Sequence, residues 1–298
     1  MLRVFVWLEL RTCSVPDVRG KDSRQAASRR YLIVMFEPVV SLRSLRVDVP
    51  PGKVVTFISD VHLGYGSRDR DRTREDLLLP ILRSCAETSA HLFIVGDLFD
   101  LWFDYNTVIP RWHVRTLAAL QELRAGGLPV SYLIGNHDFG HHTYFREELG
   151  IEVDLGDVSA TINGTRVYIS HGDGKAHQDT GYLVLRSVLR NRFAQWLYRW
   201  IHPDWGIALA SRTSHGSRDH TSEKDYGPHD GLRDFALAKI DEGYDLVVMG
   251  HRHHANVLTH GNGTYVNLGH WLGNGATYGV FSPEDGFRLI EVQPKATP

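Results

Sequence analysis

The chain has 298 residues, which is enough for one large domain or two small ones. Its 33 basic and 35 acidic residues give a formal net charge of −2, so there is no overall basic field to recruit nucleic acid. Its two cysteines, Cys13 and Cys85, exclude a disulfide framework and a thiolate zinc cluster, and they are typical of a protein of the reducing cytoplasm.

The first 34 residues differ from the rest of the chain. Met1–Leu10 resembles a short signal-like run, but Glu9 interrupts it and no small-residue cleavage site follows. Residues 11–30 are rich in Arg, Ser, Gly and Asp, a composition typical of disorder. We expect residues 1–34 to be a disordered tail or an upstream extension of a chain that starts at Met35. No apolar stretch approaches the roughly 20 residues that a membrane-spanning helix needs.

The next part of the chain alternates short apolar runs with amphipathic segments. The predicted strands are Leu42–Val49, Val54–Ser59, Leu92–Val95 and Val130–Ile134, and the predicted helices are Thr73–Ala86 and Arg111–Ala125. Pro80 is compatible with the first helix only if the helix kinks or ends early. Gly126 and Gly127 form a C-cap signature after the second helix. This β-α-β-α-β order predicts a layered α/β domain.

The pattern changes in the second half. Asn163-Gly164 is a hairpin signal, so strand Arg166–Ser170 should join an antiparallel part of the sheet. The later elements are helix Gly181–Trp205, the polar segment Ser211–Asp230, helix Gly231–Glu242, and strands Asp245–Met249, Thr264–Leu268, Ala276–Phe281 and Phe287–Val292. We therefore expect one domain over residues 35–298, with a helical insertion at about residues 174–228.

Five of the predicted strands end in residues that can bind metal ions. The sequences that follow them are Asp60-Val61-His62, Gly96-Asp97-Leu98-Phe99-Asp100, Gly135-Asn136-His137-Asp138, His171-Gly172-Asp173 and Gly250-His251-Arg252-His253. In sheets of this kind, ligands collect beyond the carboxyl ends of the strands. Carboxylate oxygens, an amide oxygen and several imidazoles should therefore meet at one sheet edge and form a two-metal hydrolytic site.

The residue types indicate how two cations could share this site. Asp60 and His62, at positions i and i+2, face the same side of the chain and can hold one cation. Asp97 has two carboxylate oxygens, so it can bridge both cations. The remaining donors are Asn136 and His171, for the second cation, and His251 and His253, one for each cation.

The mixed oxygen and nitrogen donors, without sulfur, suit Mn²⁺, Fe²⁺ or Zn²⁺ better than Ca²⁺ or Mg²⁺ alone. Two cations about 3.5–4 Å apart can lower the pKa of a bridging water and clamp a phosphoryl group for in-line attack. A structural zinc site would explain three or four of these donors, but not a set spread over five strand ends.

These five motifs resemble those of the calcineurin-like metallophosphoesterase superfamily, and the resemblance covers residues 55–292. It implies an α/β (α+β) fold in which a β-sandwich is flanked by helices, with the site at one sheet edge. It also implies the metal ligands, which are Asp60, His62, Asp97 and His253 for one ion and Asp97, Asn136, His171 and His251 for the other.

His137 lies between the ligand Asn136 and the carboxylate of Asp138. One interpretation is a cation or general acid that faces the phosphate and is oriented by Asp138. The alternative is a histidine that only packs behind the ligands. The family pattern favours the first interpretation, so we take His137 as catalytic together with Asn136 and Asp97.

The predicted insertion combines many apolar side chains with arginines. The apolar residues are Tyr182, Leu183, Val184, Leu185, Val188, Leu189, Phe193, Trp196, Leu197, Tyr198, Trp200, Ile201 and Trp205, and the arginines are Arg186, Arg190, Arg192 and Arg199. They could form a lid over an acyl-chain chamber, with the arginines facing phosphates or an anionic membrane. They could equally form two packed helices with solvated arginines. Binding of single-stranded nucleic acid also fits this pattern, but the acidic body argues against it.

Further motifs resemble the UDP-2,3-diacylglucosamine diphosphatase family of lipid A synthesis. They are Gly96-Asp97-Leu98-Phe99-Asp100 with Trp102, His171-Gly172-Asp173 with Asp179 and Gly181-Tyr182, the aromatic insertion, and Asn267-Leu268-Gly269-His270-Trp271. That family cleaves the pyrophosphate of a diacylated UDP-sugar to UMP and a lipid sugar phosphate, usually with Mn²⁺. The resemblance implies substrate contacts by Asn136, His137, Asp179, Ser217, Thr221, Lys224 and His251.

The chain departs from the better-studied branch of that family. That branch has Arg in place of His137, Thr in place of Arg252, and an acidic pair near Asp104-Tyr105. The resemblance therefore implies a divergent branch of the lipid enzyme.

The leading prediction is a cytoplasmic pyrophosphohydrolase, peripheral to the inner membrane, that acts on an acylated UDP-sugar and needs no obligate protein partner. Membrane contact is expected from Trp196, Trp200 and the neighbouring arginines. The alternative is a soluble phosphodiesterase or nucleotide pyrophosphatase of the same fold, with an insertion that is only structural. A non-catalytic scaffold of this fold would have no chemical reason to retain the full ligand set.

Overall fold

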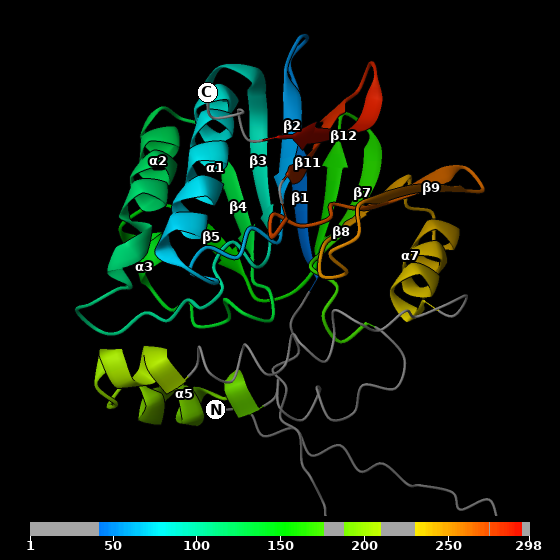
Figure 1. Cartoon of the computed structure of the whole chain (residues 1–298). Coiled ribbons are helices and arrows are strands. Elements are labelled where there is room, and N and C mark those ends of the chain that lie inside the picture. Colours follow the sequence, from blue (N-terminus) through cyan, green and yellow to red (C-terminus); the bar gives the residue numbers. More distant parts are fainter. Residues whose placement is uncertain (1–41, 176–187, 210–229, 274, 294–298) are drawn as a thin grey trace, which may run out of the picture. The chain divides into compact units, whose positions relative to one another are not determined.

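The computed structural model describes residues 42–175, 188–209, 230–273 and 275–293 (Figure 1). Contacts divide the chain into residues 1–35 and residues 36–298. The expected tail, residues 1–34, and most of the expected insertion at about residues 174–228 lie outside the described residues. Within the described part of the chain, no helix is both long and apolar enough to cross a bilayer.

Two six-stranded sheets form the centre of the larger unit. The first has the order β1 (Arg43–Val47), β6 (Val158–Ile162), β7 (Thr165–Ser170), β8 (Leu246–Met249), β10 (Gly263–Asn267) and β9 (Asn256–His260). The second has the order β12 (Gly286–Val292), β11 (Ala276–Ser282), β2 (Val54–Ile58), β3 (Ser89–Val95), β4 (Val130–Leu133) and β5 (Glu152–Asp154). Both sheets mix parallel and antiparallel pairs, and the hairpin predicted at Asn163-Gly164 joins β6 to β7.

Apolar side chains from both sheets meet in one buried layer. Phe57 of β2 and Phe93 of β3 stack with ring centroids 5.3 Å apart, and they share a cluster with Ile169 of β7 and Val248 of β8. Side chains alternate between the two faces of a strand, so each sheet gives one face to this layer and the other to a helix. The predicted sandwich flanked by helices is therefore confirmed.

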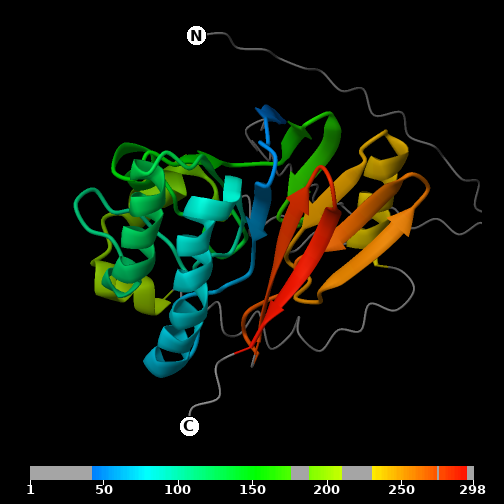
Figure 2. The same cartoon turned by 90° about the horizontal axis from the view of Figure 1, so that it is seen from above.

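Helices cover the outer faces of both sheets (Figure 1, Figure 2). Helices α1 (Arg68–Thr88) and α2 (Val114–Ala125) lie side by side and pack on the second sheet, where they share a buried cluster with Ile94 and Tyr132. Helix α7 (Gly231–Asp241) packs on the first sheet through Ala236, against Val247 and other residues. The shorter helices are η1 (Arg111–His113), α3 (Tyr144–Glu147) and α5 (Arg192–Tyr198).

Helix α1 is longer than the sequence pattern predicted. It begins at Arg68, where the Ser67 hydroxyl accepts a hydrogen bond from the Arg70 N–H at 3.4 Å, and it continues through Pro80 to Thr88. Of the two alternatives for Pro80, a kink or an early end of the helix, the early end is wrong. A proline in a helix costs about 3 kcal/mol, but Pro80 is exposed while its neighbours on the sheet side are buried.

The described part of the predicted helical segment Gly181–Trp205 is largely helical, but it is not one continuous helix. Asn191 lies outside helical geometry, and its side chain accepts hydrogen bonds from the N–H groups of Phe193 and Ala194 at 2.9 and 3.1 Å. Asparagine is a strong N-cap residue, so a new helix, α5, starts there. A further helical stretch covers residues 203–209, beginning at Pro203, a residue favoured in the first helical turn.

Candidate metal centre

The candidate ligands follow the carboxyl ends of five strands. Strands β2, β3 and β4 are parallel in one sheet, and β7 and β8 are parallel in the other. Parallel strands end at the same sheet edge, so their loops touch. The Asp60 N–H donates to Gly96 O at 3.2 Å, and the Gly250 N–H donates to His171 O at 3.1 Å. The two sheets are connected there, because the His251 N–H donates to Asp60 Oδ2 at 3.0 Å.

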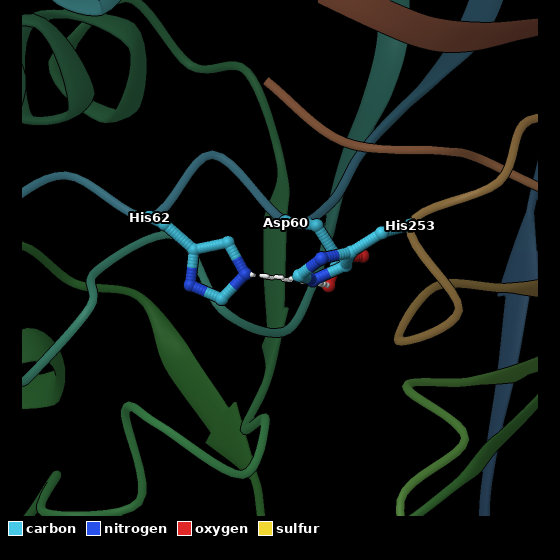
Figure 3. Close-up of side chains that lie close together, drawn as sticks. All are labelled: Asp60, His62 and His253. Carbon is cyan, nitrogen blue, oxygen red and sulfur yellow. Dashed lines mark hydrogen bonds and ion pairs between the residues drawn. The ribbon is translucent and has the colours of Figure 1, made fainter. Parts of the chain in front are cut away.

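Asp60, His62 and His253 form the first group of candidate ligands (Figure 3). Their side chains point toward one another, with the Nε2 atoms of His62 and His253 3.0 Å apart. Asp60 Oδ1 lies 3.2 Å from His253 Nε2 and 3.7 Å from His62 Nε2. Asp60 and His62 are completely buried. Three ligand atoms therefore converge on one point, two of them from completely buried residues and the third from His253, whose side chain is 27% exposed.

Asn136, His171 and His251 converge on a second point. Asn136 Oδ1 lies 3.0 Å from His171 Nε2 and 2.9 Å from His251 Nδ1. His171 Nδ1 lies 2.9 Å from the carbonyl oxygen of Val95, to which it can only donate a proton. The other nitrogen, Nε2, is then left with its lone pair toward the site when the imidazole is neutral.

Asp97 lies between the two groups. Its Oδ2 is 3.3 Å from His171 Nε2 and 3.8 Å from His62 Nε2. Its Oδ1 accepts a hydrogen bond from the His137 N–H at 2.9 Å, which fixes the plane of the carboxylate. The carboxylate is thus in reach of both groups, as a bridging ligand must be.

The backbone of the candidate ligands is unusual. Positive φ angles occur at Asp60 (53°), His62 (51°), Asp97 (53°), His251 (70°) and His253 (55°). Non-glycine residues rarely adopt this left-handed conformation, and when they do they concentrate at functional sites. Here it turns the chain back immediately after each strand, so that the side chain faces the shared edge.

Three glycines provide the space that the ligand side chains occupy. A Cβ atom at Gly135 would collide with the Asp97 carboxylate, and one at Gly250 would collide with Ser59 Oγ and Asp60 Oδ2. A Cβ atom at Gly96 would lie 2.5 Å from His171 Nδ1. These positions therefore exclude any side chain while the ligands keep their places.

Burial and the neighbouring charges set the ionisation of the site. Burial raises the pKa of Asp60, but the neighbouring imidazoles of His253 and His62 outweigh it and hold that pKa well below its usual value. Burial lowers the pKa of His171, but the Asp97 carboxylate outweighs it and raises that pKa well above the usual value. Burial also lowers the pKa of His251 to about 4. The lowered pKa of Asp60 means that its buried carboxylate is ionised at neutral pH, and such a charge needs positive partners.

The family model of the calcineurin-like phosphoesterases matches residues 53–255, which is more than half of the chain. The chain belongs to this family. The match spans all five strand ends that carry the candidate ligands.

Curated relatives cover most of the chain. The UDP-2,3-diacylglucosamine hydrolase of Porphyromonas gingivalis is 28% identical over 254 residues, which are 79% of this chain and 95% of that protein. The protein of the same name from Vibrio vulnificus is 29% identical over 241 residues, 78% of this chain and 95% of its own. A solved archaeal phosphodiesterase is 15% identical with a TM-score of 0.39, over 80% of this chain and 99% of that one.

The donor set of this calcineurin-like phosphoesterase fits divalent cations. Two imidazole nitrogens cannot both carry protons at the 3.0 Å that separates His62 Nε2 from His253 Nε2, so at least one lone pair faces the other ring and Asp60. Among the described residues, the buried atom Asp60 Oδ1 accepts no hydrogen bond. Oxygen and nitrogen donors without sulfur are the ligands of Mn²⁺, Fe²⁺ and Zn²⁺.

His137 is in the site, but its neighbours differ from those expected. The Asp138 carboxylate accepts hydrogen bonds from the Gly135 N–H at 2.7 Å and the Leu98 N–H at 2.9 Å, and from the Tyr132 hydroxyl at 2.5 Å. It holds the loops of β3 and β4 together rather than orienting His137, so that part of the prediction is wrong. Burial lowers the pKa of His137 to about 4, so its imidazole is neutral at pH 7.

The expected substrate contacts are only partly described. Asn136, His137 and His251 lie at the metal centre, whereas Asp179, Ser217, Thr221 and Lys224 lie outside the described residues.

Arg190 contacts the metal-site loops directly. Its Nη2 donates to Asp173 Oδ2 at 3.0 Å and to Gly135 O at 3.3 Å. The Arg190 guanidinium is thus bound to protein groups and is not simply solvated, as the interpretation of two packed helices had it. It connects the insertion to the loops that carry Asn136 and His171.

A hollow of about 1010 Å³ lies between helix α5 with residues 203–209 and the loop before η1. Its apolar lining includes Trp112, Trp196, Trp200 and Ile207, and Arg111 and Arg199 border it. The insertion is therefore not packed flat on the body in the described residues.

Two residues near the metal centre were not among the predicted site residues. Asp100 is buried, with its Oδ1 3.5 Å from His62 Nδ1 and 3.9 Å from His137 Nδ1. A carboxylate on Nδ1 directs Nε2 of His62 to the cation position. His270 stacks beside His253 with ring centroids 5.3 Å apart. The spacing Gly-Asp-x-x-Asp was a signal for Asp100. His270 lies in the recognised motif Asn267-Leu268-Gly269-His270-Trp271, but no role had been assigned to its imidazole.

Proposed function

We propose that this protein is a dinuclear-metal pyrophosphohydrolase that cleaves UDP-2,3-diacylglucosamine to UMP and 2,3-diacylglucosamine 1-phosphate in lipid A synthesis. One observation carries the proposal: seven candidate ligands from five strand ends gather in two groups that share Asp97. The proposed substrate is inferred from the relatives, which are named UDP-2,3-diacylglucosamine hydrolase and align over most of their length.

In this proposal one ion binds to Asp60, His62, Asp97 and His253, and the other to Asp97, Asn136, His171 and His251. Mn²⁺ is the proposed metal, with Fe²⁺ and Zn²⁺ as alternatives that the same donors accept. When bound, two such ions lower the pKa of a shared water and neutralise phosphoryl oxygens. The reaction is then hydrolysis of the phosphoric anhydride without a covalent enzyme intermediate.

The protein's own groups position the substrate. The His137 ring lies 5.1 Å, between centroids, from that of His62, and 13% of its side chain is exposed, which supports a contact with substrate. A neutral imidazole there donates an N–H to a phosphoryl oxygen. Burial in low dielectric makes such a hydrogen bond stronger than in water. Asp179, Ser217, Thr221 and Lys224 are proposed as further substrate contacts.

The insertion would hold the acyl chains and meet the inner-membrane surface on the cytoplasmic side. Its described apolar side chains are exposed to an extent unusual for a protein in water: Phe193 66%, Trp196 51%, Trp200 77% and Trp205 73%. Exposed aromatic patches mark contacts with membranes or ligands. The hollow of about 1010 Å³ beside them is large enough for acyl chains.

A mixed-micelle assay tests the substrate. With Mn²⁺, the protein should release UMP from UDP-2,3-diacylglucosamine at least 100-fold more efficiently, in kcat/KM, than from the soluble UDP-N-acetylglucosamine. The control is Asp97→Ala, which removes the bridging carboxylate and should lower both rates by at least 1000-fold. Equal or faster turnover of the soluble substrate would favour a nucleotide pyrophosphatase or phosphodiesterase and overturn the lipid substrate.

A further inference from the structure

His270 lies beside the metal centre without belonging to it. It follows β10, and its ring centroid is 5.3 Å from that of His253, with the two planes inclined by 40°. None of the candidate ligand groups found in the described residues includes it. The residue is half-buried, so it is not sealed inside the protein.

The turn that carries His270 is fixed to the loops of the metal centre. The Asn267 Nδ2 donates to Gly250 O at 2.6 Å, and the Trp271 N–H donates to Asp60 O at 3.1 Å. On its other side, Trp271 is buried, and its indole N–H donates to Thr277 O at 3.0 Å. The backbone at His270 is therefore fixed relative to Asp60, a candidate ligand of the first group.

The ring of His270 is fixed in one tautomer. The backbone N–H of Leu272 lies 2.9 Å from His270 Nδ1 and can only donate, so Nδ1 must accept. The ring proton of the imidazole is then on Nε2. This excludes Nδ1 as a metal ligand, and it leaves Nε2–H as a donor that needs an acceptor.

We propose that His270 is a substrate-contacting residue, whose Nε2–H donates a hydrogen bond to an oxygen of the phosphoryl group bound at the metal centre, on the side of His253. The proposal rests on the proposed hydrolysis of a phosphoric anhydride. A phosphoryl group has oxygens beyond those that two cations can engage, and each accepts hydrogen bonds. A rigid donor beside the cations contacts such an oxygen without moving.

Binding of inorganic phosphate tests this contact separately from turnover. The probe is phosphate titrated into the full-length Mn²⁺-loaded protein by calorimetry, with metal content measured on the same samples. His270→Ala should keep two metal ions and weaken phosphate binding at least fivefold. His270→Gln, whose amide keeps a donor, should stay within about threefold of wild type. The matched control is His254→Ala, which removes an exposed neighbouring imidazole and should leave phosphate binding unchanged.

The outcomes are distinct. Phosphate binding by His270→Ala that equals wild type would overturn the proposal, and so would loss of a metal ion from that variant, since His270 would then support the ligands alone. A purely structural role would weaken binding in His270→Gln as much as in His270→Ala.

NMR of the wild-type protein keeps the proposal testable if His270→Ala does not fold. With Zn²⁺ and ¹⁵N-labelled histidine, the His270 signals should show the Nε2–H tautomer and should shift on addition of phosphate. The Nδ1–H tautomer, or no shift, would overturn the proposal. Neither measurement uses the lipid substrate, so a failed micelle assay with these results intact would refute the proposed function and leave the His270 contact standing.

Discussion

Several side chains at the metal centre are held in a backbone conformation that costs stability. The left-handed region costs a non-glycine residue roughly 1–2 kcal/mol, and five candidate ligands adopt it, among them Asp60, Asp97 and His251. Some of this cost is offset by hydrogen bonds made in the same conformation, such as the one from the His251 N–H to Asp60 Oδ2. A protein selected only for stability would have glycine or asparagine at these positions, so the strain indicates selection for the side chains.

Gly135→Ala should disrupt the centre by displacing one carboxylate. The new methyl group would meet the Asp97 carboxylate and lie 2.6 Å from the Asp97 backbone nitrogen. Overpacking of this kind costs roughly 1–3 kcal/mol, which the fold can tolerate. We expect a folded variant by circular dichroism that retains at most one metal ion per chain by mass spectrometry.

The matched control for Gly135→Ala is Gly126→Ala. Gly126 has an ordinary φ of −73°, and its added methyl group would come no closer than 3.3 Å to the backbone of α2. This variant should keep two metal ions. Two ions in Gly135→Ala as well would refute the steric dependence of Asp97 on this glycine.

At the scale of the elements, strand β3 carries a buried base that makes stability depend on pH. His91 of β3 stacks on Phe93, and its Nε2 lies 3.0 Å from Ser131 Oγ of β4. Burial lowers the pKa of His91 to about 4. In the unfolded chain the pKa is about 6.5, so the unfolded state takes up a proton first as the pH falls. The stabilising contribution is complete above pH 6.5 and is lost progressively down to about pH 4.

Urea unfolding at pH 7 and pH 5 measures this contribution. Through His91 alone, the wild type should lose roughly 2 kcal/mol of unfolding free energy between these values. His91→Gln keeps a partner for Ser131 without titrating, so its loss should be smaller by about that amount. The control His260→Gln removes an exposed imidazole of β9 and should lose as much as wild type. Equal losses for all three proteins would show that His91 does not set the pH dependence.

The elements of the sandwich core were predictable, whereas several others were not. Strands such as β2 and β8 are continuous apolar runs, because both of their faces are buried. β9 was missed because three of its five residues, including Val257, are exposed and the other two are only partly buried, so its sequence shows no alternation of apolar and polar residues. The start of α5 was missed because the capping of its N–H groups by Asn191 outweighs the helical spacing that runs through this position.

Part of the site could also be predicted from the sequence. Each predicted ligand follows a buried parallel strand, and parallel order brings such ends together within one sheet. The packing of the two sheets then brings Asp60 and His251 into contact. The hydrogen-bond partner of the Asp138 carboxylate could not be predicted in this way, because the carboxylate binds the Leu98 N–H, which is forty positions away in the sequence. The position of His270 at the metal centre could not be predicted for a related reason, although its motif was recognised. Its neighbour His253 follows a different strand, and only the pairing of β10 with β8 brings the two together.

At the scale of the whole molecule, the catalytic edge and the insertion are physically coupled. Arg190 binds Asp173 and Gly135 O, and Tyr198 of α5 packs on Phe103 with ring centroids 4.5 Å apart. The insertion therefore has one side anchored near the metal centre, while its aromatic side chains remain exposed. A protein that takes its substrate from a bilayer needs this arrangement, because the site must stay ordered while the apolar surface is embedded.

Vesicle sedimentation tests whether this surface meets a membrane. Trp196 and Trp200 are 51% and 77% exposed, and burying an aromatic side chain of this size is worth roughly 2 kcal/mol. The wild type should sediment with vesicles of phosphatidylethanolamine and phosphatidylglycerol, and Trp196→Gln with Trp200→Gln should reduce the bound fraction at least fivefold. Val257→Gln changes an exposed apolar residue of β9 (48% exposed) and should sediment as wild type does. If wild type stays in the supernatant even with anionic vesicles, the aromatic surface serves only the substrate hollow, and the peripheral membrane location is wrong.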